Sequence, residues 1–276
     1  MRMTFQIEPE DIREIKVEPL DVTFKVYSEP TLYDNTFWDK VESGSYEPDT
    51  LFTLKRHVSP YVVFFDVGSA VGVMTLVAAS LGAKCITYEP VPKFFTALSK
   101  NIDLNLGIKD HIVSKQSVVS NISQSTISLR DQVGHSISSI VYSENQDEVS
   151  NLVDLKKEIL NYCSTLKPII KFDIEGAEYK LLWDEELLQI LQEKKAILVL
   201  AIHPGFFRPM RKHKNLFILK LAWFKFIIRN YIDNYKLYKN LISFCKVKRS
   251  NDVEVLSAHK FCMMSAAGVY EYNLYF

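Results

Sequence analysis

From residue 61 onwards, apolar β-branched runs alternate with helix-forming segments, and this alternation limits the folds open to the chain. The run "YVVFFDVG" at 61–68 is apolar as far as Asp66, which is typical of a strand buried on both faces. Further strands are predicted from "KCITYEP", "HIVSKQSVVS", "PIIKFDI" and "AILVLAIHP". Helices are predicted in between, at 71–82, 93–105, 152–163 and 175–192.

The pattern predicts an α/β fold of Rossmann-like type, with a mostly parallel sheet and helices on both faces. The last segments, 259–266 and 268–276, read as a C-terminal antiparallel hairpin. Residues 1–55 read as an N-terminal extension of short elements, and 56–276 as one α/β domain. No internal repeat interrupts this order.

Charge is unevenly distributed, although the net charge of the 276-residue chain is zero. The stretch 208–249 holds twelve Lys and Arg residues and one acid, Asp233. Overall neutrality argues against whole-domain affinity for nucleic acid or membrane, so any such contact would be local to this stretch. We interpret residues 206–250 as a basic helical insertion.

The four cysteines lie far apart, without CxxC or metal-ligand spacing: Cys85, Cys163, Cys245 and Cys262. Free, packed thiols in a reducing cytoplasm are therefore expected. The acidic, polar start of the chain lacks the features of a signal peptide, and the longest apolar run is broken by Lys220 and Lys225. The expected location is the cytoplasm, with peripheral contact to the inner face of a membrane as a further option.

A glycine turn follows the first predicted strand, in "DVGSAVG" from Asp66 to Gly72. Gly68 and Gly72 allow tight turns and a close approach of a ligand to the backbone. The next strand ends in Glu89-Pro90, and a carboxylate at that point can accept hydrogen bonds from ribose hydroxyls. The spacing therefore predicts a nucleoside site at this edge of the sheet.

The turn departs from a dinucleotide fingerprint, because Ala70 stands where the glycine that admits a pyrophosphate is expected. Asp66, ahead of the first glycine, would repel phosphate but suits the ammonium of an amino-acid tail. S-adenosylmethionine combines such a tail with a ribose and has no phosphate. A simple strand-to-helix connection is the alternative interpretation.

In combination, these motifs resemble the FkbM-type S-adenosylmethionine-dependent methyltransferases. The family shows a D-V-G-x-x-x-G turn, an E-P pair, an N-x-x-x-N helix end and a K-x-D-x-E-G-x-E block in this order. Here the last two are Asn101 with Asn105, and Lys171 to Glu178. The resemblance covers about residues 35–205, and Ser69-Ala70-Val71 departs from the more usual Ala-Asn-Ile.

The resemblance implies roles for the residues that match the motifs. Asp66, Gly68, Ser69 and Gly72 would line the methionine end of the cofactor, and Glu89 would hold its ribose. Three further positions are weaker candidates that also have ordinary structural interpretations: Thr75 for the tail, Ser117 for the adenine and Glu47 from the N-terminal extension. The implied activity is O-methylation of a sugar in a polysaccharide, lipopolysaccharide or glycosylated metabolite.

The block "PIIKFDIEGAEYKLL" brings charge to the end of a buried strand. Alternate residues share a face of a strand, so Lys171, Asp173 and Glu175 point the same way. A lysine within such a strand needs an ion-pair partner, and Asp173 and Asp66 are the candidates. Negative charge at a helix start is favourable, so we assign Glu178 a structural role.

His203 ends the next predicted strand, at the same edge as Asp173. A base that titrates near neutral pH can remove the proton of an attacking hydroxyl, so we predict His203 as base and Asp173, with Lys171, as positioning groups. A Mg²⁺ site of Asp173, Glu175 and His203, as in some related O-methyltransferases, is the less favoured alternative because histidine is a poor Mg²⁺ ligand.

The basic stretch predicts a helix pair with apolar residues on one side and Lys/Arg on the other. A covering helix with a solvated basic face is the plain interpretation. A lid, a contact for an acidic glycan and a helix on anionic lipid are the others. Two other functions stay open: a nucleic-acid methyltransferase, disfavoured because no Asn/Asp-Pro-Pro-aromatic turn follows the fourth strand, and a catalytically silent scaffold. The oligomeric state is not predicted.

Overall fold

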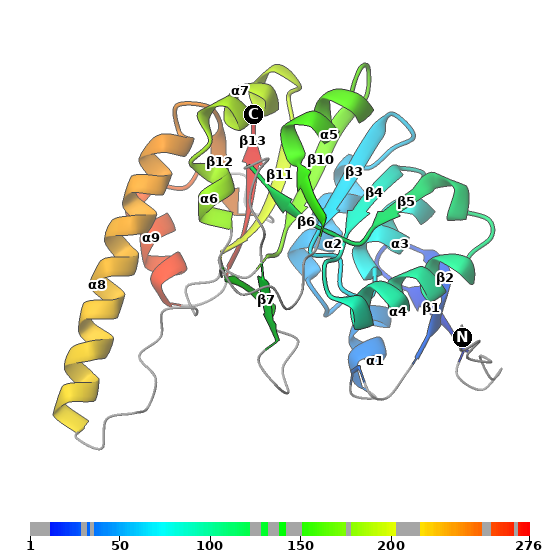
Figure 1. The fold of residues 1–276 in the computed structure, drawn as a ribbon, viewed down its shortest axis with the longest axis horizontal. Coiled ribbons are helices and arrows are strands. Elements are labelled where there is room, and N and C mark those ends of the chain that lie inside the picture. The colour runs from blue at the N-terminus through cyan, green and yellow to red at the C-terminus, as the bar shows by residue number, and fades with distance from the viewer. Residues whose placement is uncertain are drawn as a thin grey trace. The chain divides into compact units, whose positions relative to one another are not determined.

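The computed structural model describes most of the chain, and its elements are shown in Figure 1. The described residues are 12–28, 32–33, 36–121, 128–131, 138–141, 151–174, 178–202, 216–249, 255–267 and 270–276. Contacts divide the chain into two compact units, Met1–Gln116 and Ser117–Phe276. The predicted boundary at residue 55 stays a prediction.

The first unit contains five strands, four helices and a short 3₁₀ turn among its described residues. In chain order these are β1 (Ile12–Val17), β2 (Val22–Tyr27), α1 (Thr36–Glu42), α2 (Pro48–His57), β3 (Val62–Val67), α3 (Val73–Ser80), β4 (Lys84–Tyr88), α4 (Pro92–Asp103), η2 (Lys109–His111) and β5 (Ile112–Lys115).

Parallel pairing of β3 with β4 and of β4 with β5 confirms the predicted alternation of strands and helices in this unit. Every residue of β3 is buried, as its continuous apolar run predicted. The antiparallel hairpin of β1 and β2 lies against α3 and α4. Because α3 packs on β3 and β4 as well as on β2, the whole stretch Val73–Ala79 is buried, which explains why this helix is apolar on all sides.

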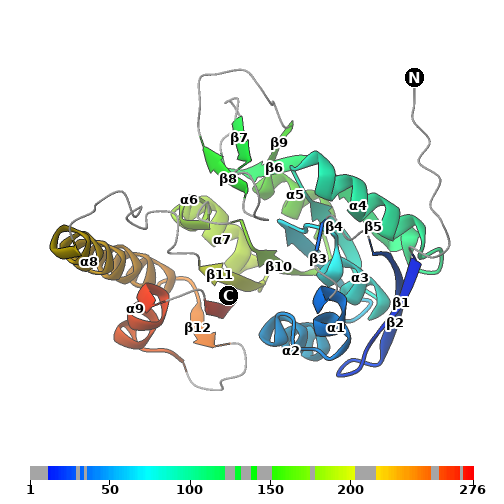
Figure 2. The ribbon, with the colours of Figure 1, turned by 90° about the horizontal axis from the view of Figure 1, so that it is seen from below.

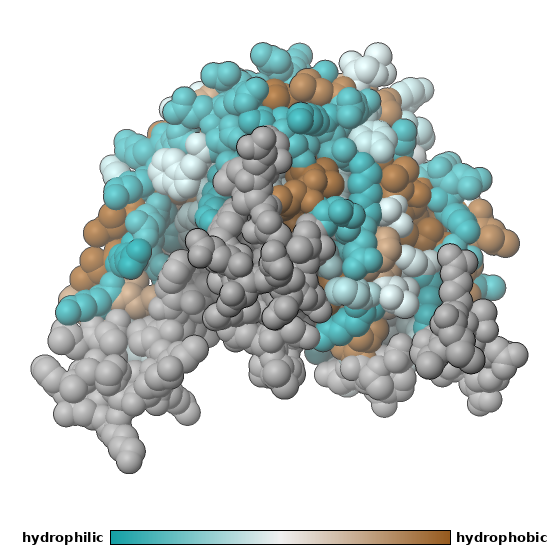
Figure 3. All heavy atoms as spheres, in the orientation of Figure 1, coloured by the Kyte–Doolittle hydropathy of each residue, from teal (hydrophilic) through white to brown (hydrophobic). Residues whose placement is uncertain are grey.

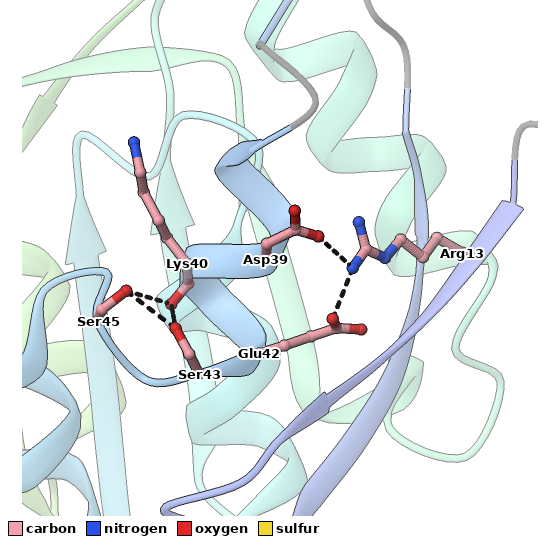
Figure 4. A network of polar contacts seen from close by, with 6 residues as sticks. All are labelled: Arg13, Asp39, Lys40, Glu42, Ser43 and Ser45. Atoms are coloured by element: carbon pink, nitrogen blue, oxygen red, sulfur yellow. Dashed lines mark hydrogen bonds and ion pairs between the residues drawn. The ribbon is translucent and has the colours of Figure 1, made fainter.

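A charged network fixes the N-terminal hairpin to α1 (Figure 4). Arg13 of β1 reaches Asp39 at 2.7 Å and Glu42 at 2.5 Å. These two carboxylates raise the pKa of Arg13 above its ordinary value, mainly through the hydrogen bond to Asp39. Because all three side chains are partly exposed, the network locates α1 more than it stabilises the fold.

The second unit contains the remaining described elements. They are β6 (Ser117–Ser120), β7 (Ser128–Asp131), β8 (Ser138–Val141), β9 (Asn151–Asp154), α5 (Leu155–Tyr162), β10 (Lys167–Phe172), α6 (Glu178–Leu182), α7 (Glu185–Glu193), β11 (Ile197–Ile202), α8 (Leu216–Leu241), β12 (Lys246–Arg249), α9 (Ala258–Ala267) and β13 (Tyr270–Tyr275).

Here β10 and β11 are parallel, and β13 pairs antiparallel with both β11 and β12. The antiparallel strand pair at the C-terminus is thus confirmed, but its first strand was predicted wrongly. Residues 258–267 form helix α9, and β12 supplies the partner of β13. Phe261, Cys262 and Ser265 are buried on one face of α9. Their spacing is that of a helix, and their burial decides for a helix over the strand that was predicted.

Three other predicted elements differ in extent. The third predicted strand divides at Gln116, since β5 pairs with β4 whereas β6 pairs with β9. The predicted helix 175–192 divides into α6 and α7, because the Asp184 side chain accepts a hydrogen bond from the Leu187 N–H and starts a new helix. The described part of the basic stretch holds one helix, α8, rather than a pair, and it ends in strand β12, which pairs with β13.

The long helix α8 lies against α9, and the two are seen side by side in Figures 1 and 2. None of the helices in the described part of the chain is both long enough and apolar enough to span a bilayer. All four cysteines are free and buried, as predicted. Burial raises the pKa of the Cys245 thiol to about 12, so this thiol is protonated at neutral pH.

Candidate functional site

The turn after β3 adopts left-handed backbone at three positions. Gly68 has φ of 86°, Ala70 of 48° and Gly72 of 88°. At Gly72 an added Cβ would lie 2.4 Å from Leu98 Cδ1 of α4, so only glycine fits without displacing that side chain. Gly68 and Ala70 are half-buried, which leaves the outer part of the turn accessible.

The turn is joined to the end of β4 by backbone hydrogen bonds. The N–H groups of Gly68 and Ser69 donate to the Tyr88 carbonyl at 3.0 and 3.2 Å, and the Ser69 hydroxyl lies 3.3 Å from the same oxygen. The Ser69 hydroxyl is therefore already hydrogen-bonded within the protein. If Ser69 contacts the cofactor, as predicted, it would do so through its backbone atoms.

The Glu89 carboxylate also links the turn to the end of β4. Its Oε2 accepts a hydrogen bond from the Ala70 N–H, and its Oε1 accepts one from the Val91 N–H, both at 2.8 Å. Glu89 is only 5% exposed. An ionised carboxylate can accept about four hydrogen bonds, so this structural role is compatible with the predicted role toward a ribose.

Asp66 lies buried beneath the turn with Thr75. The Thr75 hydroxyl donates to Asp66 Oδ2 at 2.7 Å and lies 3.1 Å from Thr87 Oγ1. Burial, and then the negative charge of Asp66, raise the pKa of the Cys85 thiol well above its usual range. Thr75 is completely buried and holds Asp66 by this hydrogen bond, and its predicted role toward the cofactor tail stays a prediction.

Asn101 and Asn105 have a definite function in the structure, which the sequence did not show. Asn101 donates to the Val71 carbonyl in the turn at 2.9 Å and accepts from the Tyr27 N–H at 2.7 Å. Asn105 accepts from the Lys25 N–H at 2.8 Å and donates to the Lys25 carbonyl at 2.7 Å. Two side chains one helical turn apart thus bind the edge of β2 and fix the glycine turn.

Glu47 occupies the N-cap of α2 with a left-handed backbone, φ of 44°, and its carbonyl accepts from the Leu51 N–H. It lies next to an aromatic cluster that sequence analysis missed. Phe37 stacks on Tyr33 at 4.0 Å between ring centroids and meets Tyr46 edge-on at 5.0 Å. Tyr33 also contacts Phe94 in the first turn of α4, so the cluster reaches the helix that follows Glu89.

In the second unit, Lys171 forms an ion pair at the end of β10 with Asp173, one of its two predicted partners. Lys171 Nζ lies 3.0 Å from Asp173 Oδ2, and the two side chains are 5% and 28% exposed. The partly exposed carboxylate is available to a ligand, whereas the lysine is held inside. Glu175 and His203 lie outside the described residues, so the predicted base and the alternative Mg²⁺ site stay predictions.

Glu178 has the structural role that was predicted for it. It is buried in the first turn of α6, and its Oε1 accepts a hydrogen bond from the Ile174 N–H at 3.2 Å. The neighbouring Tyr179 hydroxyl donates to Asn234 Oδ1 of α8 at 2.8 Å. Burial raises the pKa of Tyr179 above its ordinary value, so this tyrosine is a hydrogen-bond donor rather than a base.

Ser117 was predicted to lie at the end of a strand. In the structure it is the first residue of β6, because β5 ends at Lys115. It is buried, and its hydroxyl has no hydrogen-bond partner among the residues that the structure covers. Its predicted role toward adenine stays a prediction. Within the same covered ranges, no group of three or more His, Cys, Asp or Glu residues has a metal-site arrangement.

No family model matches the chain, and neither does any curated protein. The FkbM resemblance therefore stays a prediction. Solved structures similar to the chain include an O-methyltransferase from Bacillus cereus in complex with S-adenosylhomocysteine (SAH), at 10% identity and a TM-score of 0.40, covering 83% of this chain and 81% of that one.

Another is the precorrin-6y C5,15-methyltransferase from Geobacter metallireducens, at 11% identity and a TM-score of 0.36, covering 82% and 86%. A third is an RNA methyltransferase from Salinibacter ruber in complex with SAH, at 16% identity and a TM-score of 0.31, covering 61% and 84%. Likenesses this weak do not decide an activity, so the function depends on the site itself.

Proposed function

We propose that this protein is an S-adenosylmethionine-dependent O-methyltransferase that acts on a hydroxyl group of a sugar. The observation that supports the proposal is the pair of carboxylates at one edge of the first unit: Asp66 beneath the glycine turn, and Glu89 bound to the turn backbone at Ala70. The sugar acceptor, in a polysaccharide, lipopolysaccharide or glycosylated metabolite, is inferred from the motif resemblance.

The donor set suits a nucleoside that carries a cationic tail. Glu89 offers acceptor oxygens to ribose hydroxyls, and Asp66 gives the turn a negative potential that attracts an ammonium and repels phosphate. Ala70 also has a Cβ where a pyrophosphate would require glycine. These residues therefore fit S-adenosylmethionine better than a dinucleotide.

Asp173, Lys171 and His203 are the residues that we propose for the acceptor chemistry. When bound, S-adenosylmethionine provides a methyl group on a positively charged sulfur. We propose that His203 would accept the proton of the acceptor hydroxyl as that oxygen takes the methyl group and the neutral thioether leaves. Asp173, anchored by Lys171 at 3.0 Å, would orient the sugar by accepting a hydrogen bond from another of its hydroxyls.

Calorimetry with ligand analogues tests the nucleoside site without altering the protein. SAH is expected to bind, and methylthioadenosine, which lacks the amino-acid tail, to bind about tenfold or more weakly, because it loses a charge-assisted interaction. NAD should not bind detectably. Binding of NAD in preference to SAH would refute the assignment, and a folded chain that binds neither would favour a silent scaffold.

His203 is tested by the change His203→Asn. We expect kcat for sugar methylation to fall about 100-fold, within the range of a lost general base, while SAH affinity stays within about twofold. His111→Asn is the matched control, because His111 is an exposed histidine of the first unit, and its rate should not change. An unaltered rate for His203→Asn would remove His203 from the mechanism.

A further inference from the structure

Helix α8 carries two apolar stripes, of which only one is covered by protein. The buried stripe recurs at intervals of four and three residues: Phe226, Asn230, Asn234, Leu237 and Leu241. This stripe faces the rest of its unit, where α8 packs on α9 and α6. Asn234 of this stripe accepts a hydrogen bond from the Tyr179 hydroxyl of α6, which agrees with its inward position.

The second stripe has the same spacing and is exposed. Its members are Phe224, Ile228, Ile232 and Tyr235, and each is at least 41% exposed, with Phe224 at 62%. Ile242, 43% exposed, follows directly after the helix. At 100° per residue, Phe224, Ile228 and Tyr235 lie within about 40° of one another on the helix surface. Hydrophobic residues over α8 are visible at the left of Figure 3.

The basic residues of α8 border this exposed stripe. All five, Lys220, Lys225, Arg229, Lys236 and Lys239, are exposed, and the helix has one acid, Asp233. Lys225, Arg229 and Asp233 join Phe224, Ile228 and Ile232 in lining a shallow surface hollow. Arg229 lies within ion-pair distance of Asp233, at 3.7 Å. An apolar stripe beside a row of positive charge is thus presented to the surroundings.

We propose that α8 docks on the surface of an anionic lipid bilayer, with the stripe of Phe224, Ile228, Ile232 and Tyr235 inserted at the headgroup boundary. Helices that lie in the membrane interface combine a large apolar face with lysine and arginine beside it. Aliphatic side chains bury their area among acyl chains, while the flanking lysines bind phosphate groups. The helix would lie on the membrane rather than cross it, as its charge content requires.

Other occupants fit the same surface less well. A second copy of this chain in a two-fold dimer would bring two strongly basic faces together, which is unfavourable. A nucleic acid would meet the lysines but leave a stripe of aliphatic side chains without a partner, because phosphate contacts come from polar and charged groups. A bilayer satisfies both the apolar and the basic component.

Vesicle co-sedimentation of the full chain tests the proposal. We expect binding to phosphatidylcholine vesicles that contain phosphatidylglycerol, and little binding to phosphatidylcholine alone. Raising the salt from about 0.1 M to about 1 M shortens the screening length from about 10 Å to about 3 Å and should weaken the binding. Equal binding to both vesicles, or none to either, would overturn the proposal.

Paired variants separate the two components. Ile228→Gln with Ile232→Gln should weaken vesicle binding roughly tenfold or more, through lost apolar burial. Lys225→Gln with Lys236→Gln should weaken it by about fivefold for each lysine. These side chains are exposed, so the fold should be retained, which circular dichroism can verify.

Matched controls carry the same chemical changes elsewhere: Leu106→Gln, at a side chain that is 79% exposed, and Lys16→Gln with Lys109→Gln. They should bind vesicles like the unaltered chain. If the controls weaken binding as much as the α8 variants do, or if the chain forms a dimer that the α8 variants abolish and binds no vesicle, the membrane assignment is wrong. None of these assays requires S-adenosylmethionine, so their outcome is independent of the proposed catalysis.

Discussion

Replacing Gly72 by alanine is expected to lower the free energy of unfolding by about 3 kcal/mol and to weaken SAH binding at least about tenfold. The left-handed backbone at φ of 88° costs a residue with a Cβ about 1–2 kcal/mol. The new methyl would also lie 2.4 Å from Leu98 Cδ1, and overpacking of this kind adds about 1–3 kcal/mol. Chemical denaturation and calorimetry measure the two effects.

Gly107→Ala is the matched control for Gly72→Ala. No atom lies within 4 Å of the Cβ that it would add, and Gly107 is exposed and outside the strained backbone region. Its free energy of unfolding should therefore change by less than about 0.5 kcal/mol. If Gly72→Ala were as stable as Gly107→Ala and still bound SAH, the turn would not have the rigid geometry on which the nucleoside site depends.

The double variant Gly72→Ala with Leu98→Ala separates the two contributions to the lost stability, which are steric overlap with Leu98 and backbone strain at residue 72. Removing the Leu98 side chain frees the space but leaves the left-handed backbone in place. The double variant should then lose less than the sum of the two single changes, since the residues are in contact. If the two changes in the free energy of unfolding were strictly additive, the Leu98 side chain of α4 would not contact the new methyl group in the turn.

The sequence was most informative where a single local rule decides the structure. The continuous apolar run of β3, the glycines behind it and the glutamate at the end of β4 each have one plausible geometry, and the structure has that geometry. The pairing of Lys171 with Asp173 was one of two predicted options, the other being Asp66, because a lysine in a buried strand needs an acid nearby and Asp173 lies two positions along on the same face.

Errors arose where tertiary partners decide between two local options. Residues 258–267 could form a strand or a helix, and burial of Phe261 and Cys262 on one face selects the helix. The division of β5 from β6 depends on β9, more than thirty residues away along the chain. No periodicity within either segment contains that information.

The roles of individual site residues were harder to predict than their positions. Glu89 stands at the expected point, yet its carboxylate binds two backbone N–H groups, at Ala70 and Val91, before any ligand is considered. Asn101 and Asn105 were known only as part of a resemblance, and their contacts cross from α4 to β2, seventy or more residues earlier. Such cross-chain pairing depends on the completed fold.

Asp173→Ala is expected to lower the free energy of unfolding by about 3–5 kcal/mol and to abolish methyl transfer. The change would remove the carboxylate that lies 3.0 Å from the Lys171 ammonium, whose side chain is 5% exposed, and breaking a buried ion pair by removing one partner is strongly destabilising. Loss of activity would follow from loss of the group that positions the acceptor. Denaturation and a turnover assay on the folded fraction measure these effects.

Removing both charges separates stability from function. In Lys171→Met with Asp173→Ala the buried cation is gone, and methionine occupies much of the lysine volume, so most of the lost stability should return. Activity should not return, because the carboxylate is still absent. A double variant that regains turnover would show that Asp173 serves only to neutralise Lys171. If Asp173→Ala is as stable as the unaltered chain, the pair does not hold the end of β10, and the acceptor site must be sought elsewhere.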